Sequence, residues 1–337
     1  MDIFRMYHES IPQFITDTLS AHEMIRLKGI GMDCGCEYTS FSLFDSLTPY
    51  SRYDHSLGVA LIVWHFTGDV QQTLAALFHD ISSPVFAHVI DFLNGDHMTQ
   101  ESTEKGIPEI IASSKEIGSI LRHLGLTCDD VSDYHRFPVA DNDSPRLSAD
   151  RLEYTCGNII RYGFASLQEV QSWYEDLFVG INEEDAPELM FSTKESALRF
   201  AQASLKCSKV YVSDEDRFSM QTLAEILKRA IRDGVLSRED LDTTESAVIQ
   251  KLQQSERYRM EWERFRSYRQ VLHSDTPDHG RSWIQVPSKK RFIDPFVSGV
   301  GRLSGISEVF HKEVFDFIAE SLDYWICGQP ETSLDFM

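Results

Sequence analysis

Apolar residues recur at helical spacing along most of the chain. In the segment 14–30 they occupy positions 14, 15, 19, 24, 25 and 27, and Gly29 closes the run. The segments 55–66 and 70–80 are also apolar at helical rather than alternating spacing, which predicts helices. The same pattern predicts a helix over Glu109–Leu124 that stops at Gly125. Further helices are expected over 148–162, 193–212 and 218–233, and one more beginning at Ser237.

Patterns typical of strands are few and lie near the C-terminus. The segments 283–286 and 291–297 predict a short antiparallel pair, with the basic residues Lys289 and Lys290 between them. The polar segment 273–280 is the best candidate for a boundary. We therefore expect an all-α fold, with a helical domain over 1–270 and a small mixed α/β appendage over 271–337.

Composition is typical of a folded soluble protein, with 42% apolar and 25% charged residues among 337. The longest apolar stretches are too short to cross a bilayer. The first residues show no signal-peptide pattern, and the six cysteines are scattered. These features predict a cytoplasmic protein with reduced thiols and no membrane partner. A net charge of −21 disfavours binding to duplex nucleic acid, although a local group of arginines can still bind a small anion.

The residues with chemical potential fall in four short segments. In chain order these are Arg52-Tyr53-Asp54-His55, Leu77-Phe78-His79-Asp80, Pro84-Val85-Phe86-Ala87-His88 and Ala149-Asp150-Arg151-Leu152-Glu153-Tyr154. Two imidazoles and two carboxylates, from His55, His79, Asp80 and Asp150, supply mixed nitrogen and oxygen ligands. Such a set suits Mn, Fe, Co, Ni, Zn or Mg with open positions for water and substrate. The alternative for His79 and Asp80 is a buried hydrogen-bonded pair without metal.

In these segments the sequence resembles the HD-domain phosphohydrolases, and within them the branch of deoxynucleoside triphosphate triphosphohydrolases. That family has the ordered pattern His, His-Asp, Asp, and the flanking segments SRYDHSLGV, LFHDISSPVFAH and ADRLEY also match. The match is strong over about 50–165 and weaker to about 300. It implies an HD-domain helical bundle with a divalent metal ion and a nucleotide substrate. Because related enzymes form oligomers, it also implies a homo-oligomer.

The resemblance also implies a role for each matching residue. His55, His79, Asp80 and Asp150 would bind the metal, and His88 would lie near the scissile phosphate. Arg52 and Arg151 would contact phosphates, and Tyr154 would contact the sugar. His97 is a second candidate catalytic residue, and Gln100 and Glu101 are alternatives for its position. His123 could bind a second metal, although a helix-end histidine explains it equally well.

The sequence departs from the family pattern at Ser83, where relatives carry a histidine of the acid–base relay. Three functions therefore stay open. The first is hydrolysis of a deoxynucleoside triphosphate, and the second is phosphodiester or pyrophosphate hydrolysis of another small nucleotide. The third is a regulatory module that binds metal and nucleotide without turnover. A di-iron oxygenase is a remote fourth. The basic run of Lys289, Lys290 and Arg291 is either a solvent-exposed turn, which we favour, or a subunit or nucleotide contact.

Overall fold

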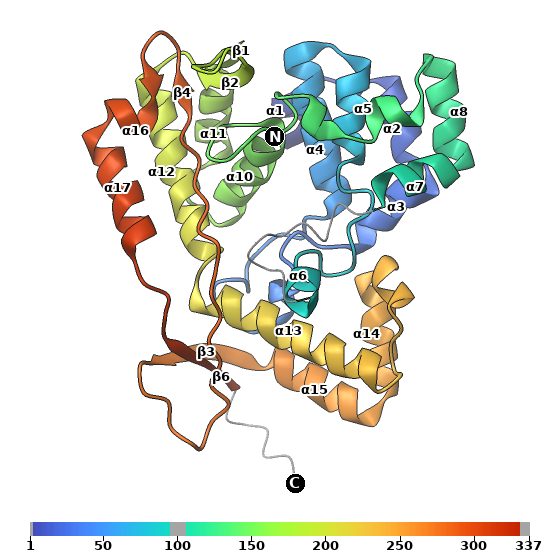
Figure 1. Cartoon of the computed structure of the whole chain (residues 1–337), viewed down its shortest axis with the longest axis vertical. Helices are drawn as coiled ribbons and strands as arrows, with labels where there is room; N and C mark the ends of the chain where they lie inside the picture. Colours follow the sequence, from blue (N-terminus) through green and yellow to red (C-terminus); the bar gives the residue numbers. More distant parts are fainter. Residues whose placement is uncertain (1–2, 95–105, 331–337) are drawn as a thin grey trace.

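The structure, a computed structural model, describes residues 3–94 and 106–330 and is mainly helical (Figure 1). The helices of the first half are α1 (Ile3–Tyr7), α2 (Gln13–Leu19), α3 (His22–Arg26), α4 (Arg52–Thr67), α5 (Val70–Phe78), α6 (Val89–Asn94), α7 (Ile107–Ser113), α8 (Lys115–Leu124), α9 (Cys128–Val131) and α10 (Ala149–Arg161). Those of the second half are α11 (Leu167–Tyr174), α12 (Lys194–Val210), α13 (Asp214–Arg232), α14 (Glu245–Gln254), α15 (Glu256–Arg266), α16 (Leu303–Ile306) and α17 (Glu308–Ala319).

Two small β-structures accompany the helices. A four-stranded sheet has the order β1-β2-β4-β5, and a separate two-stranded ribbon pairs β3 with β6. The strands are β1 (Leu177–Ile181), β2 (Pro187–Phe191), β3 (Tyr268–Ser274), β4 (Phe296–Val297), β5 (Gly301–Arg302) and β6 (Trp325–Pro330). All pairings are antiparallel except β2 with β4. The prediction of a mainly helical chain with mixed structure near its end is confirmed. Residue 270, where we placed the end of the helical domain, lies inside strand β3.

The predicted strand pair near the C-terminus is wrong. Ile284 forms an isolated bridge with Ile326 instead, and Phe296 pairs with both β2 and β5. Pro287 lies between the two predicted segments and Pro295 lies within the second, and neither has the N–H group that a ladder needs. Ile326 and β2 are distant in sequence from the segments they pair with, whereas β5 follows Phe296 closely. The β1–β2 hairpin was not predicted.

Two predicted helices are each broken into two. The run 14–30 divides into α2 and α3, because Ser20 ends the first helix with its hydroxyl on the Asp17 carbonyl and Ala21 is extended. The run 109–124 divides at Ser114, whose Oγ accepts a hydrogen bond from the Ile117 N–H and so starts α8. Serine at such positions competes with helix continuation, which the apolar spacing alone does not indicate.

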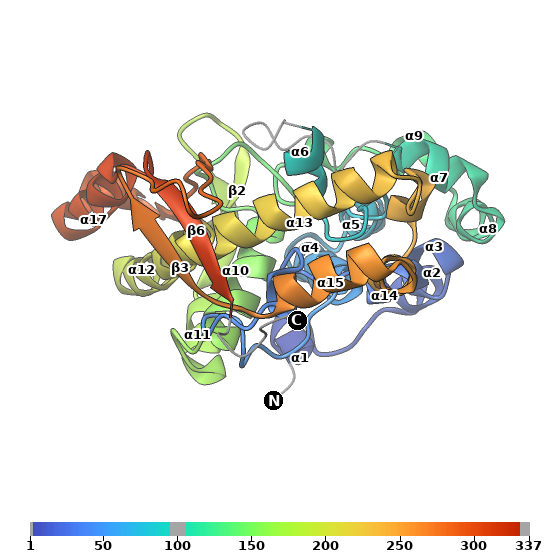
Figure 2. The same cartoon turned by 90° about the horizontal axis from the view of Figure 1, so that it is seen from below.

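The apolar core has two main clusters. The larger one joins α1–α5, α7–α12 and the β1–β2 hairpin, and the C-terminal residues Ile293, Val297 and Phe310 pack into it. The second joins α6, α13–α15 and the β3–β6 ribbon. Figure 2 shows α13 lying across the molecule, with the ribbon near one end and α15 alongside. The segment after α5 passes from the first cluster, at Ile81, to the second, at Phe86.

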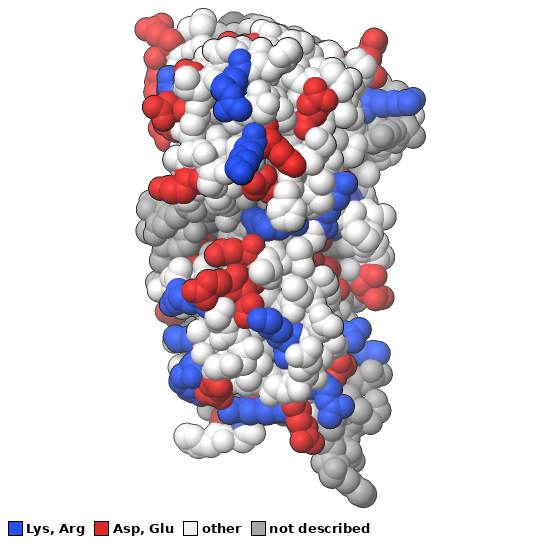
Figure 3. Space-filling view, turned by 90° about the vertical axis from the view of Figure 1, so that its right-hand side faces the viewer, with Lys and Arg blue, Asp and Glu red and all other residues white. Residues whose placement is uncertain are grey.

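The surface carries charges of both signs. On the face drawn in Figure 3, Lys and Arg side chains lie among Asp and Glu side chains rather than in a separate field. None of the helices within residues 3–94 and 106–330 combines the length and the apolar character that crossing a membrane requires.

Candidate metal centre

Three helix ends bring the four predicted ligands together. A capping box between Ser51 and Asp54 starts α4 and places His55 in its first turn. His79 is the C-cap residue of α5, and Asp80 follows it directly. Asp150 lies in the first turn of α10, which Ser148 caps.

The four side chains, which we call the His–Asp group, converge on one point. The Nε2 atoms of His55 and His79 lie 3.1 Å apart, and Asp150 Oδ1 lies 3.1 Å from the former and 3.7 Å from the latter. Asp80 Oδ2 lies 3.8 Å from His55 Nε2 and 3.6 Å from His79 Nε2. Ligand atoms of His55, His79 and Asp80 all lie within 4.8 Å of one another, and Asp150 approaches from the more exposed side.

Both imidazoles use their other nitrogen on the protein. His79 Nδ1 lies 2.7 Å from the Ala76 carbonyl oxygen, which can only accept, so the ring donates there and Nε2 keeps a lone pair. His55 Nδ1 lies 2.5 Å from Glu153 Oε2, which favours the same tautomer. Two lone pairs and two carboxylates then face one another. A cation satisfies such a donor set, so these residues fit a divalent metal ion.

The charges of the metal-free group are strongly coupled. Burial acts to lower the pKa of His55, but the carboxylates of Asp150 and Glu153 outweigh it and raise that pKa to about 10. Burial acts to raise the pKa of Asp80, yet the Arg52 guanidinium and the two histidines hold it well below its usual range. A metal ion would therefore compete with a proton for His55.

Arg52 and Ser83 both bind Asp80. Arg52 Nη1 donates to Asp80 Oδ2 at 2.7 Å, and Ser83 Oγ donates to Asp80 Oδ1 at 2.7 Å. Arg52 Nε is buried and has no hydrogen-bond partner among the described residues. Ser83 is completely buried, so the position where the resemblance implies a histidine is filled here by a residue that binds the predicted ligand Asp80.

His88 forms a second, separate His–Asp pair. Its Nδ1 lies 3.0 Å from Oδ2 of the buried Asp91, and about a third of the His88 side chain stays exposed. Phe86 and Ala87, just before it, are buried in left-handed backbone conformations with φ of 58° and 45°. Strain of this kind in non-glycine residues is kept where a particular side-chain position is needed. The His88 backbone N–H reaches the Cys34 thiol, which is also electrostatically coupled to Arg52.

Arg151 and Tyr154 extend the site along α10. The Arg151 guanidinium is bound to the 141–146 loop, with Nε on the Arg146 carbonyl at 2.7 Å and Nη1 on Asp141 at 3.0 Å. The Tyr154 ring centroid lies 6.4 Å from that of His55, and 6.4 Å from that of Tyr211. The structure thus brings Tyr154 beside the predicted ligand His55 but directs Arg151 to a neighbouring loop.

Other predicted residues lie elsewhere. His97, Gln100 and Glu101 are outside the described residues. His123 is exposed in the last turn of α8 and does not belong to the His–Asp group. All six cysteines are free, as expected. Sequence reasoning missed Glu153 and Asp91, although each follows a predicted residue by three positions, which is one helical turn.

Known proteins have sequences similar to that of this chain. No family model matches the chain. The uncharacterized protein YdhJ of Bacillus subtilis is 31% identical over 255 residues, which cover 75% of this chain and 74% of YdhJ. The chain belongs to the same family as YdhJ. The metal-dependent phosphohydrolase cns2 of Cordyceps militaris is 25% identical over 224 residues, covering 65% of this chain and 60% of cns2.

Solved structures show the same fold. A hypothetical protein from Aquifex aeolicus aligns with a TM-score of 0.66 and 16% identity, over 94% of this chain and 93% of its own. A phosphohydrolase from Bacteroides thetaiotaomicron aligns with a TM-score of 0.62 and 13% identity, over 96% and 97%. At such identities the likeness concerns the fold alone.

Proposed function

We propose that this protein is a metal-dependent phosphohydrolase of the HD type that acts on a nucleotide, in the first place a deoxynucleoside triphosphate. The observation that carries the proposal is the pair of imidazole Nε2 atoms, 3.1 Å apart, that face two carboxylates with both Nδ1 atoms already engaged. The sequence similarity to cns2 supports the general class of reaction.

His55, His79, Asp80 and Asp150 would hold the metal ion. When bound, the ion supplies Lewis-acid activation of water and of a phosphoryl oxygen. Arg52 and Ser83 fix both oxygens of Asp80, so this ligand is oriented before any metal or substrate arrives. The partly exposed Asp150 leaves the group open on the α10 side, where a phosphate can approach.

His88 is suited to proton transfer. Asp91 engages Nδ1 of the ring, and Nε2, which has no hydrogen-bond partner among the described residues, can give a proton to a leaving oxygen or take one from water. An imidazole is the side chain whose ordinary pKa suits this task near neutral pH. In this scheme the pair of His88 and Asp91 replaces the relay histidine, whose position is occupied here by Ser83.

Tyr154 supports a nucleotide as the substrate. Its ring centroid lies 6.4 Å from that of His55 and 6.4 Å from that of Tyr211, and the residue follows Asp150 by one helical turn. A sugar can pack against such a ring while its phosphate lies at the metal. The same ligands would also serve for phosphodiester or pyrophosphate hydrolysis of another small nucleotide.

A second candidate function is a module that binds metal and nucleotide without turnover. Ser83 favours it, because a buried hydroxyl bound to Asp80 cannot act in acid–base relay. Arg52 favours it too, because its guanidinium is paired with Asp80 rather than free for phosphate.

A combined metal analysis and product screen separates these functions. The full chain, loaded with Mn or Mg, is incubated with a set of nucleotides, and the products are identified. Triphosphate release from deoxynucleoside triphosphates with bound metal supports the first function, and bound metal without any product supports the second. Asp80→Ala should lose both metal and hydrolysis, whereas Asp45→Ala, at an exposed carboxylate, should keep both. Full activity in Asp80→Ala would overturn the scheme.

A further inference from the structure

Arg26, the last residue of α3, binds the main chain directly after the predicted ligand Asp80. Its Nη2 atom donates to the Ile81 and Ser83 carbonyls, both at 2.9 Å. Hydrogen bonds from a charged donor are stronger than those between neutral groups. One nitrogen of Arg26 thus links both ends of the short segment 81–83 and fixes its position relative to α3.

The segment 80–83 forms a tight turn that closes on Asp80 itself. The Ser83 N–H donates to the Asp80 carbonyl at 2.9 Å, and the Ser83 hydroxyl donates to Asp80 Oδ1 at 2.7 Å. Both Ile81 and Ser83 are completely buried. A shift of the Ser83 main chain would therefore move the hydroxyl that orients one oxygen of the Asp80 carboxylate. The other oxygen is bound by Arg52.

The same guanidinium also binds the segment before α14. Arg26 Nη1 donates to the Thr243 carbonyl at 3.2 Å, and two residues earlier the Leu241 carbonyl accepts the Val85 N–H at 2.8 Å. Leu241 belongs to the second core cluster and Ile81 to the first. The turn after α5 is thus held where the two clusters meet, and Arg26 binds the segments on both sides.

The carboxylate of Asp80 must face a metal ion in a fixed direction. A ligand whose orientation is set by surrounding hydrogen bonds binds metal more tightly than one that is free to rotate. We propose that Arg26 is a positioning residue of the His–Asp group, which holds Ser83 so that its hydroxyl directs Asp80 toward the metal position. This inference rests on the proposed function and adds to it a residue outside the matched sequence motifs.

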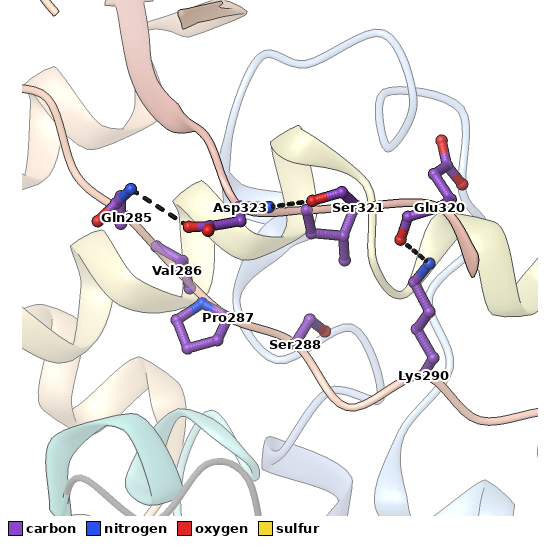
Figure 4. A pocket seen from close by; sticks show the side chains of 9 residues that line it. Gln285, Val286, Pro287, Ser288, Lys290, Glu320, Ser321 and Asp323 are labelled. Carbon is purple, nitrogen blue, oxygen red and sulfur yellow. Dashed lines mark hydrogen bonds between the residues drawn. The ribbon is translucent and has the colours of Figure 1, made fainter. Parts of the chain in front are cut away.

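Arg217 of α13 makes the same kind of contact at another place and provides the control for a purely structural role. The buried Arg217 donates from Nη1 to the Val286 carbonyl at 2.7 Å and to the Leu322 carbonyl at 3.3 Å. Val286 and Leu322 line the hollow drawn in Figure 4. Lys290 joins the same two segments by donating to the Glu320 carbonyl. Loss of the Arg217 contacts alone should therefore not unfold them.

Titration of Mn into the metal-free chain measures the role of Arg26 without requiring turnover. Arg26→Met has no donor and should bind Mn about tenfold more weakly than the wild type, as expected for loss of a group that supports a ligand. Arg26→Lys should stay within about threefold of the wild type, because one ammonium group can donate to both carbonyls that Nη2 binds. Arg217→Met should lower the melting temperature but keep the Mn affinity within about twofold. An equal loss of affinity in Arg217→Met and Arg26→Met would overturn the proposal.

The path through Ser83 gives a second test. In a chain that already carries Ser83→Ala, Arg26→Met should weaken Mn binding by at most about twofold further, because two changes on one path are not additive. Persistence of the full effect of Arg26→Met in that background would overturn the proposal. The electron paramagnetic resonance spectrum of bound Mn, which reports the geometry of the ligands, should change in Arg26→Met and not in Arg217→Met.

Hydrogen exchange in the metal-free chain separates this inference from the proposed function. The Ser83 and Val85 N–H groups should exchange faster in Arg26→Met than in the wild type, because the segment between them is no longer bound to α3. Unchanged exchange at these two groups would overturn the inference. A wild-type chain that binds Mn but releases no product from any nucleotide would instead end the proposed hydrolysis, and the effect of Arg26→Met on Mn affinity would still support the role of Arg26.

Discussion

His55 Nδ1 and Glu153 Oε2 lie 2.5 Å apart, and the carboxylate of Glu153 is completely buried. Tyr50 donates its hydroxyl to the other oxygen of the same carboxylate. Glu153 thus sets which nitrogen of His55 faces the metal position, and Tyr50 sets the orientation of Glu153. A buried carboxylate behind a histidine ligand fixes the ring and raises its strength as a donor.

Replacement of Glu153 should therefore weaken metal binding without touching a ligand. In Glu153→Gln we expect the affinity for Mn to fall by about 10-fold to 100-fold, measured by titration of the metal-free chain. Glu109→Gln, at an exposed glutamate, is the matched control and should keep the wild-type affinity. An unchanged affinity in Glu153→Gln would mean that His55 is not a ligand or does not depend on Glu153.

Gly58 gives an independent way to disturb the same carboxylate. A Cβ atom at Gly58 would lie 2.5 Å from Glu153 Oε1 and 2.6 Å from its Cγ, whereas one at Gly157 would be 3.8 Å from the nearest Tyr50 atom. Gly58→Ala should lower both the unfolding free energy, by about 1–3 kcal/mol, and the metal affinity. Gly157→Ala should stabilise α10 by about 0.5–1 kcal/mol. Thermal melts and metal titrations of the two variants make the comparison, and equal behaviour would contradict the described packing.

His88 and Asp91 should affect the rate but not the metal. Removal of a general acid or base costs about 10²–10⁴ in rate, so His88→Ala should lose this much kcat and keep its metal content. Asp91→Asn keeps the His88 ring, so its kcat should fall less than that of His88→Ala. His123→Ala is the control variant for the rate. Its metal analysis also tests whether His123 binds a second metal, because the loss of one of two ions would be seen there. Normal turnover in His88→Ala would exclude a role for His88 in proton transfer.

Asp216 should make stability depend on pH. Burial raises its pKa to about 8, Asp33 and Glu215 act in the same direction, and Cys36 and Arg217 act against them. An unfolded chain loses this proton near pH 4. The folded chain keeps it up to about pH 8, so its stability falls as the pH rises from about 4 to about 8.

Asp216→Asn removes that dependence. We expect its melting temperature to exceed that of the wild type by a margin that grows with pH, reaching about 2–4 °C near pH 8. The control Asp45→Asn, at an exposed carboxylate, should show a margin near zero at every pH. A margin that shrinks toward high pH would mean that Asp216 is ionised in the folded chain.

The sequence predicted the helices with long, regular apolar spacing, such as α4 and α5, although α4 starts earlier, at Arg52, and α5 ends earlier, at Phe78, than predicted. It did not predict the breaks at Ser20 and Ser114, because the apolar pattern continues through both. The local β1–β2 hairpin was missed although its strands are neighbours in sequence, and Phe296 was mispaired because its partner β2 is distant. Pairing of this kind depends on tertiary packing rather than on local pattern.

The residues of the candidate site also fall into those that could be predicted from the sequence and those that could not. The convergence of His55, His79, Asp80 and Asp150 could be predicted because their order and flanking segments resemble a known family pattern. The supporting residues could not, since glutamate at 153 or aspartate at 91 has no special pattern until the fold places it behind a histidine. Metal binding by the His–Asp group and phosphate binding by Arg151 stay predictions, and the structure shows the Arg151 side chain bound to the 141–146 loop.

Cys34 lies between the two halves of the site, within reach of the His88 backbone and coupled to Arg52. Burial raises the pKa of its thiol to about 12, so the folded protein presents no reactive thiolate at neutral pH. Although the Cys34 side chain is partly exposed, we therefore expect an alkylating reagent to modify it slowly at neutral pH. The extent of alkylation, read by mass spectrometry, makes this native cysteine a chemical reporter of its surroundings without any engineered label.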